Sequence, residues 1–130
     1  IQDFYAAHNI WQDGHTKVIY LHRYIMGALP GEIVDHINHH TLICTRGNLR
    51  RCTLSQSQYN TRPQKRAVYK GIYQPNGRRH WYARITNTEG RRVHLGAFAS
   101  AEDAARAYDA AARDYFGAFA FCNFPKAETP

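Results

Sequence analysis

Cysteines, acidic residues and long apolar runs are all scarce in this sequence. The three cysteines, Cys44, Cys52 and Cys122, make an odd number without a CxxC pair, so neither a disulfide framework nor a four-cysteine zinc site is expected. No apolar run approaches the roughly 20 residues of a membrane-spanning helix, and no segment has the pattern of a signal peptide. We therefore expect free thiols and a soluble cytoplasmic protein without a membrane partner. The sequence opens on Ile1 rather than Met, which leaves room for residues upstream.

Basic residues, in contrast, are abundant. Lys and Arg number 17 against 10 Asp and Glu, which gives a formal charge of +7 and a pI near 9.6. A charge of this sign favours a polyanionic partner through long-range attraction. Nucleic acid is the first candidate and an anionic membrane surface the second. With 130 residues, of which 44% are apolar, the chain is long enough for one ordinary domain or two small ones.

Turn residues and periodicity divide the chain into two modules. Residues 63–67 are basic, contain Pro63 and lack apolar anchors, which is typical of a linker. They separate a first module at 1–62, with its core at 18–62, from a second at 68–125, followed by a tail at 126–130. In the first module the sequence predicts a short strand-rich lead-in over 1–20 that ends at 17–20, followed by helical turns at 21–26. Strands at 32–36 and 48–53 around a loop at 38–47 come next, and then a helix at 55–61.

The second module has the pattern of an antiparallel meander followed by a helix. Three strand-like runs, 69–74, 80–86 and 92–96, are separated by turn signals. Ser100 with Asp103 three residues later resembles a capping box, and apolar residues recur at helical spacing before Gly117. The expected fold class is therefore α+β, with a three-stranded antiparallel sheet packed on one helix of about four turns.

Alternation gives this sheet two different faces. Trp81, Ala83 and Ile85 fall on one side of the middle strand and suit a core, which Val93 and Leu95 of the third strand share. The opposite side is basic and hydrogen-bonding, and it carries Tyr82, Arg84, Thr86, Arg92 and His94. Either this face grips nucleic acid or it is a solvated polar surface on a small sheet. The charge pattern alone does not decide between the two.

Five motifs of the second module occur in one order and spacing: YKGI at 69–72, WYARI at 81–85, VHLG at 93–96, AARAYD at 104–109 and NFP at 123–125. Over 68–125 the chain therefore resembles the ethylene-response-factor (apetala-type) DNA-binding domain. The resemblance implies a three-stranded sheet that lies in the major groove. By this resemblance the DNA contacts fall on Lys70, Arg84, Arg92 and His94. His94 stands where the plant domains usually carry Trp, and Tyr73 and Thr86 where they usually carry Arg.

In the first module, a histidine and a carboxylate adjoin at a predicted strand end. His36 can take a proton from water near neutral pH, and Asp35 can hold a divalent cation against a scissile phosphate. Asn48, twelve residues after His36, can orient that histidine by bonding across the loop. Magnesium takes few protein ligands, keeps several waters and would polarise the phosphate. The alternative is an ordinary polar strand end followed by a turn asparagine.

Short motifs surround these residues: LHR at 21–23, VDHIN at 34–38, NLR at 48–50, CT at 52–53 and SQ at 55–56. Over about 18–62 the chain resembles the phage and intron-encoded HNH homing endonucleases. That family has a ββα-metal fold, nicks or cuts DNA, and includes members with an appended ethylene-response-factor-like domain. The resemblance implies His36 as general base, Asp35 as metal ligand and Asn48 as the residue that supports the base. The implied cofactor is Mg²⁺ or another divalent cation such as Mn²⁺.

One position departs from that family's pattern. The residue nine after the loop asparagine usually carries the second metal ligand, Asn or His, and here it is Ser57, whose hydroxyl is a poor replacement. Asn60 lies three residues on, on a neighbouring part of the same helical face. Structural zinc is not expected, because the spacing of the candidate thiolate and imidazole ligands fits no standard knuckle. Those candidates are His39, His40, Cys44 and Cys52.

The leading hypothesis is a magnesium-dependent DNA endonuclease from a mobile element or phage, acting in a bacterial or phage-infected cell, whose first module cuts and whose second anchors. The alternative, which Ser57 favours, is a DNA-binding protein with a degenerate, inactive HNH module. A third class is an RNA- or ribosome-associated protein that uses the same sheet. The expected partner is double-stranded DNA, with no obligate protein partner and a monomer by default. The candidate DNA-binding residues are Arg23, Arg50, Lys70, Arg78, Arg79, Tyr82, Arg84, Arg91, Arg92 and His94.

Overall fold

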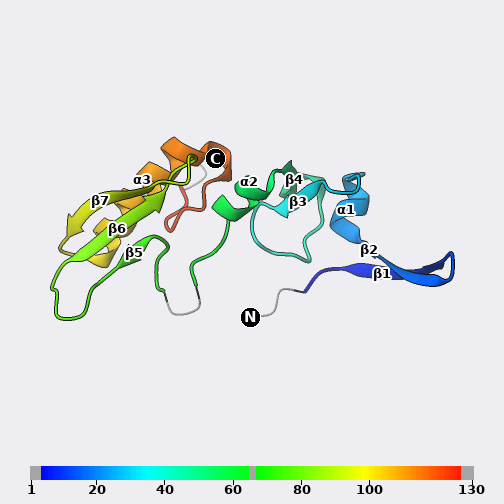
Figure 1. The fold of residues 1–130 in the computed structure, drawn as a ribbon, viewed down its shortest axis with the longest axis horizontal. Coiled ribbons are helices and arrows are strands. Elements are labelled where there is room, and N and C mark those ends of the chain that lie inside the picture. The colour runs from blue at the N-terminus through cyan, green and yellow to red at the C-terminus, as the bar shows by residue number, and fades with distance from the viewer. Residues whose placement is uncertain (1–3, 65–66, 127–130) are drawn as a thin grey trace. The chain divides into compact units, whose positions relative to one another are not determined.

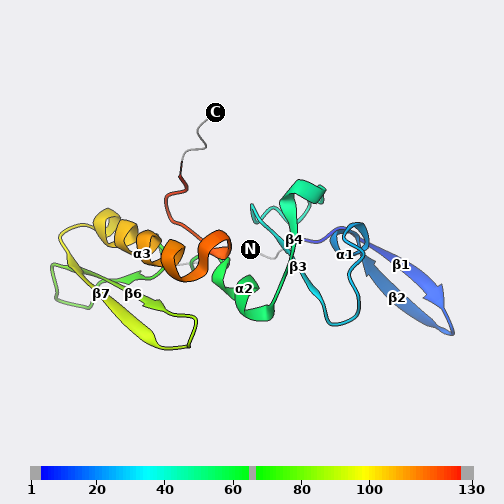
Figure 2. The same cartoon turned by 90° about the horizontal axis from the view of Figure 1, so that it is seen from above.

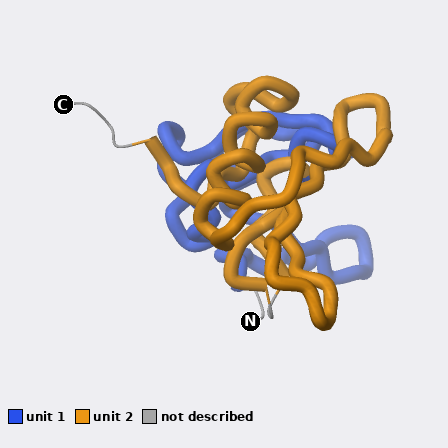
Figure 3. The backbone as a smooth tube through the Cα atoms, turned by 90° about the vertical axis from the view of Figure 1, so that its left-hand side faces the viewer, with its two compact units in different colours: residues 1–58 blue, residues 59–130 orange. Residues whose placement is uncertain are grey.

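The computed structural model describes residues 4–64 and 67–126. Lys65 and Arg66 of the expected linker and residues 127–130 of the expected tail lie outside the described residues. The chain divides into two compact units, Ile1–Gln58 and Tyr59–Pro130 (Figure 3). The architecture is mixed α+β, with small antiparallel sheets and one long helix, which confirms the expected class at that level (Figure 1). No helix in the described part is long and apolar enough to span a membrane.

The first unit opens with a two-stranded hairpin of β1 (Ala7–Gln12) and β2 (His15–Tyr20). Asp13 and Gly14 turn the chain with φ angles of 51° and 83°. A tight two-residue hairpin turn requires this left-handed pair, and an Asp-Gly dipeptide supplies it at low cost. All the strand residues are exposed except one half-buried isoleucine in each strand. The sequence predicted a strand-rich lead-in over 1–20, and the structure shows strands there, paired in a hairpin that the sequence did not specify.

A short helix and a second strand pair complete most of the first unit. Helix α1 (Leu21–Ile25) is followed by β3 (Ile33–His36), which pairs antiparallel with β4 (Leu49–Cys52). Among the described residues of this unit, Val34 and Leu49 are the two buried apolar side chains. The interior of the first unit is therefore small.

Two short helical segments flank β4. The 3₁₀ turn η1 (Arg46–Asn48) leads into it, and α2 (Leu54–Tyr59) follows it. Thr53 and Gln56 form a reciprocal capping box, because Gln56 N donates to Thr53 Oγ1 at 3.1 Å and Thr53 N donates to Gln56 Oε1 at 2.9 Å. The helix predicted at 55–61 is confirmed, with its start fixed by this cap.

The second unit is a three-stranded sheet covered by a helix. The strands β5 (Ile72–Tyr73), β6 (Trp81–Thr86) and β7 (Arg92–Phe98) pair antiparallel in that order. Helix α3 (Ala101–Phe116) lies along one face of the sheet (Figure 2), and a 3₁₀ turn, η2 (Gly117–Phe119), follows it. The predicted meander and helix are confirmed, although β5 is shorter than the run at 69–74.

The core of the second unit lies between the sheet and α3. Ile85 of β6 packs there with Tyr108, Ala112 and Phe116 of the helix. The helix begins at the predicted cap, since Asp103 N donates to Ser100 Oγ at 3.1 Å. The face of β6 that alternation assigned to the core is thus the face that the helix covers.

Two further features lock the start of the sheet to α3. Gly71 has a φ of +79° and passes so close to the helix that a Cβ there would lie 1.9 Å from the Tyr108 ring.

The second feature is a buried carboxylate, because Asp109 is 1% exposed. Its oxygens accept bonds from the backbone N–H of Asn123 at 2.7 Å and of Phe124 at 2.8 Å. The Asn123 side chain in turn bonds the backbone N–H and C=O of Lys70. Buried backbone groups of three separate segments are satisfied in this way.

Candidate nucleic-acid interface

The sheet face away from α3 carries the predicted basic residues. Arg84 and Thr86 of β6 and Arg92 and His94 of β7 are all exposed. The strand register sets Arg84 opposite His94 and Thr86 opposite Arg92. Residues opposite one another in an antiparallel pair lie on the same face. We call this surface, together with Tyr73 and Tyr82, the outer face.

Three side chains form a stacked column at one end of the outer face. The rings of Tyr73 and Tyr82, which are register partners, have centroids 5.6 Å apart and planes inclined by 26°. The guanidinium carbon of Arg84 lies 4.7 Å from the centroid of the Tyr73 ring, within the range of a cation–π contact. The three side chains therefore support one another's positions without a ligand.

Further arginines stand at the two ends of the strands. Arg78 and Arg79 lie in the exposed turn between β5 and β6, and Arg91 lies in the turn between β6 and β7. Arg91 Nε is 3.4 Å from Glu89 Oε2 in a pair that is largely exposed, so water and salt screen that pair strongly. The candidate residues Arg78, Arg79 and Arg91 thus flank the outer face at both ends.

Lys70 differs from the other predicted contacts. Its Nζ donates to the carbonyl oxygens of Tyr59 at 2.8 Å and Thr61 at 2.7 Å, and it lies 5.4 Å from the centroid of the Phe121 ring. Burial of the ammonium lowers the pKa of Lys70 to about 8. The geometry gives this ammonium a structural role at the end of α2, and its contact with DNA remains a prediction.

In the first unit, the candidate metal ligand is paired with an arginine. Asp35 Oδ2 accepts bonds from Arg50 Nη2 at 3.1 Å and from Arg50 Nε at 3.4 Å. Both side chains are 15% exposed. An arginine in this position neutralises the carboxylate that was expected to bind a cation.

The candidate general base is buried among aromatic rings. His36 is 4% exposed, and its ring centroid lies 5.1 Å from that of His22 and 6.0 Å from that of Tyr5. His36 Nε2 is 3.7 Å from the Sγ of Cys44. Burial lowers the pKa of His36, against a smaller upward effect of Asp35. The sequence analysis quoted His22 only within the LHR motif at 21–23 and gave it no role, because nothing in that motif predicts that His22 lies next to His36.

Asn48 ties the loop together. Its Oδ1 accepts from the backbone N–H of Asn38 at 3.0 Å, and its Nδ2 donates to the carbonyl of Ile43 at 2.9 Å. Asn48 was expected to orient His36 by bonding across the loop, and that effect on His36 stays a prediction. Both bonds are to backbone groups of the loop, so they explain Asn48 as a residue that stabilises the loop, without a catalytic role.

The other two proposed metal ligands occupy different settings. Ser57 is a residue of α2 whose N–H bonds the carbonyl of Thr53 at 3.0 Å, whereas Asn60 follows the helix and is 5% exposed. Within residues 4–64 and 67–126, no group of three or more His, Cys, Asp or Glu side chains is arranged to hold a metal ion. A requirement for Mg²⁺ or Mn²⁺ stays an untested prediction.

Arg23, a further candidate DNA contact, is bound within the first unit. Its guanidinium donates to the carbonyl of Glu32 and, at 2.9 Å, to that of Leu29. With Arg50 paired to Asp35, both predicted DNA-binding arginines of this unit have internal partners. The charge of Arg50 is neutralised by Asp35, whereas the guanidinium of Arg23 keeps its charge and is held by two backbone carbonyls.

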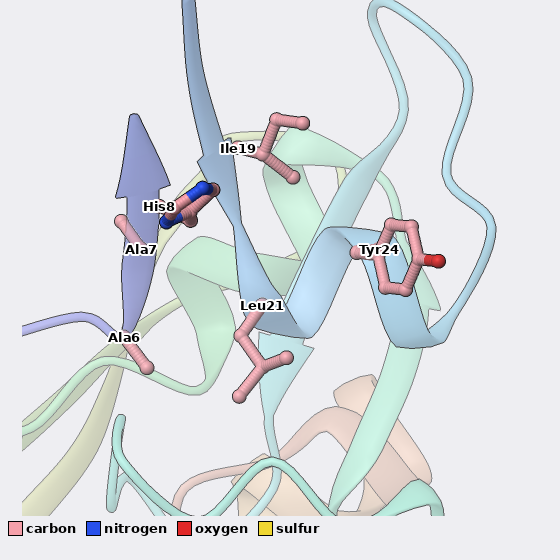
Figure 4. Close-up of a pocket in the computed structure, with 6 residues that line it drawn as sticks. All are labelled: Ala6, Ala7, His8, Ile19, Leu21 and Tyr24. Atoms are coloured by element: carbon pink, nitrogen blue, oxygen red, sulfur yellow. The ribbon is translucent and has the colours of Figure 1, made fainter. Parts of the chain in front are cut away.

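The first unit also has an apolar hollow of about 380 Å³ beside the hairpin (Figure 4). It is lined by Ala6, Ala7, His8, Ile19, Leu21 and Tyr24. Apart from one imidazole and one phenol, these side chains are apolar. The hollow therefore offers few groups that recognise phosphates or base edges.

Comparison with known proteins gives relatives that match about half of the chain. No protein-family model matches the chain. Over 65 residues, or 49% of the chain, it is 51% identical to an AP2/ERF and B3 domain-containing protein of Oryza sativa. Over 64 residues, or 48% of the chain, it is 50% identical to an ethylene-responsive transcription factor of Arabidopsis thaliana. A dehydration-responsive element-binding protein of Oryza sativa is 46% identical over 65 residues, or 48% of the chain. The chain spans 17%, 24% and 20% of these relatives, respectively.

These relatives correct the leading hypothesis. They are plant proteins named for an AP2/ERF and B3 domain, for binding a dehydration-responsive element and as an ethylene-responsive transcription factor, so the predictions of an HNH homing endonuclease, of a hydrolase and of a phage or mobile-element origin are wrong. The structure gives a physical reason, because the Asp35 carboxylate that was expected to bind a cation is paired with Arg50. The architecture shows no HNH module, and the expected bacterial or phage-infected cell has no support. The alternative, a DNA-binding protein with a degenerate, inactive HNH module, fits better in its DNA-binding part.

Proposed function

We propose that this chain is a non-catalytic DNA-binding protein that holds double-stranded DNA against the outer face of its three-stranded sheet. The observation that carries the proposal is the outer face itself, on which Arg84, Arg92 and His94 are exposed side by side while α3 covers the opposite face. The names of the relatives, which are transcription factors, support the same conclusion. The protein would act in the compartment that holds the cell's DNA.

The charge of the second unit supports this assignment. Residues 59–130 contain 12 Lys and Arg against six Asp and Glu. The major groove is wide enough to admit a β-ribbon. Arginine is a frequent protein contact both of base edges in that groove and of the phosphates beside it. One chain carries the complete sheet, so a monomer suffices for binding.

Salt dependence is the quantitative signature of this function. Each phosphate that a basic side chain neutralises contributes about −0.9 to the slope of log affinity against log salt. About five contacts would therefore give a slope of roughly −4 to −5. A polar sheet face that only meets solvent would bind duplex weakly and show no such slope.

The test is fluorescence anisotropy with a labelled duplex at several salt concentrations. Arg84→Ala and Arg92→Ala should each weaken binding about fivefold or more and reduce the salt slope by about 1. Arg46→Ala is the matched control, because Arg46 is an exposed arginine of the first unit. Equal affinities for all three variants would contradict the proposal, as would binding by the wild type that is insensitive to salt.

A further inference from the structure

We propose that the outer face also binds an unpaired nucleobase of single-stranded nucleic acid, which stacks on the column of Tyr82, Tyr73 and Arg84. The inference rests on the proposed function in assigning the outer face to nucleic acid. It adds a different ligand state, an exposed base, at one defined place on that face.

The column is a preformed stacking platform. Tyr73 contacts Tyr82 with centroids 5.6 Å apart and planes 26° from parallel, and the Arg84 guanidinium lies 4.7 Å from the Tyr73 ring. Aromatic rings and guanidinium planes are the two surfaces on which proteins stack unpaired bases. Arg84 is exposed, so a base can extend the column at its guanidinium.

A duplex offers such a platform fewer stacking surfaces than a single strand does. In double-stranded DNA the faces of each base are covered by the neighbouring bases, and most protein contacts go to phosphates, sugars and base edges. A ring stack offers little to a base edge or a phosphate. Every unpaired base, in contrast, has a π-face that can stack on the rings regardless of sequence. Two stacked tyrosines on an otherwise polar face therefore fit a strand whose bases are free.

Positive charge lies on both sides of the column. The turn that joins β5 to β6, with Arg78 and Arg79, adjoins the strand ends at which Tyr73 and Tyr82 lie. On the other side, β7 carries His94 opposite Arg84 and then Arg92. A strand crossing the outer face would meet cations for its phosphates before and after the base on the column, as single-strand binding surfaces combine a basic track with aromatic stacking.

The experiment compares three labelled oligonucleotides of the same sequence and length: single-stranded DNA, single-stranded RNA and duplex DNA. The full chain is titrated as the wild type, as the double variant Tyr73→Leu/Tyr82→Leu and as Tyr73→Phe/Tyr82→Phe. The leucine pair should lower the ratio of single-strand to duplex affinity about tenfold, and the phenylalanine pair, which keeps both rings, should preserve it. Tyr115→Leu is the control, because Tyr115 is an exposed tyrosine on α3.

The outcomes separate this inference from the proposed function. An unchanged ratio in the leucine pair, with duplex binding still dependent on Arg84 and Arg92, would overturn the stacking site and leave duplex binding intact. Absence of any binding by the wild type would overturn both. Tighter binding of the RNA than of the single-stranded DNA, lost in the leucine pair, would identify RNA as the source of the base.

A second measurement covers the case in which the leucine pair fails to fold. The wild type is titrated with the single-stranded DNA and with the same strand carrying abasic sites. Stacking predicts that the abasic strand binds about tenfold more weakly, although its phosphates are unchanged. Equal affinity for the two strands would overturn the inference without any variant.

Discussion

The two units of this chain bury and expose opposite kinds of surface. Among the described residues, 12 of the 14 strongly exposed large apolar side chains belong to the first unit, including Trp11 at 74% and Tyr24 at 73% exposure. The second unit has only Val68 and Tyr115 in that group. Charge is distributed the other way, since residues 1–58 carry five Lys and Arg against four Asp and Glu. The second unit therefore has both its own core and most of the attraction for a polyanion.

The interiors differ as well. In the first unit, the buried residues include His22, His36 and Asn48, whereas the second unit buries mainly alanines and aromatic rings of α3. A polar interior contributes less hydrophobic stabilisation and depends on complete hydrogen bonding. We expect the second unit to be the more stable of the two, and the following changes test that difference with hydrogen exchange, which reports each unit separately.

Gly71→Ala should have the largest effect and should reverse the order of stability. A methyl group would clash with the Tyr108 ring at 1.9 Å and would also force a φ of +79° on alanine. Overpacking and left-handed strain together should lower the free energy of unfolding by about 4 kcal/mol. Gly90→Ala is the matched control, because Gly90 has a φ of +78° with nothing within 4 Å of the added carbon. A similar loss in both variants would show that strain alone, without the clash, sets the cost.

Asp109→Ala should have the next largest effect, again confined to the second unit. The change removes the acceptor of three bonds, from Asn123 N, Asn123 Nδ2 and Phe124 N. Buried donors left without a partner should lower the free energy of unfolding by about 3 kcal/mol. Hydrogen exchange of the second unit measures the loss, and Asp114→Ala, on an exposed position of α3, serves as the control. Equal stability of the two variants would refute the structural role of Asp109.

A modest fall in pH should destabilise the first unit selectively. Burial lowers the pKa values of His22 and His36, and the nearby His36 and Arg23 lower that of His22 further. The unfolded chain therefore binds protons near pH 6.5 that the folded unit does not, so stability falls as the pH drops below about 6.5. In the second unit, Lys70 with a pKa of about 8 and Tyr108 with a pKa of about 12 titrate above that window.

The measurement is hydrogen exchange of both units at neutral and at mildly acid pH. His22→Phe, which fills the site with a ring that has no proton to gain, should flatten the pH dependence of the first unit. Equal acceleration of exchange in both units would contradict the explanation from buried histidines.

The sequence predicted the second unit better than the first for a physical reason. Alternation in β6 and helical spacing in α3 follow from one face being buried, so Ala83 and Ile85 could be assigned to the core in advance. The hairpin β1–β2 buries little on either face, so it has no such periodicity, and only Asp13-Gly14 signalled it. The Tyr73–Tyr82 stack depends on a strand register that the loop between them sets.

The error over catalysis has a different origin. The motif around Asp35 and His36 matches by residue type, but the chemistry depends on which groups surround the carboxylate. Register in the β3–β4 pair sets Arg50 opposite Asp35, and short motifs do not show whether such a neighbour forms an ion pair or remains apart. Cross-strand partners, more than letters in the motif, determine what a carboxylate can do.

The contacts of Tyr59 determine where an expression fragment of the second unit can begin. The Tyr59 ring stacks on Phe116 with centroids 4.0 Å apart, its carbonyl accepts from Lys70 Nζ and from Phe121 N, and it is the last residue of α2. A fragment that begins at residue 68 would lack Tyr59 and Thr61. Its core would lose the ring that stacks on Phe116, and the Lys70 ammonium would lose its carbonyl acceptors. An expression fragment of the second unit should therefore begin before Thr53, so that α2 keeps its cap and Tyr59 keeps its place.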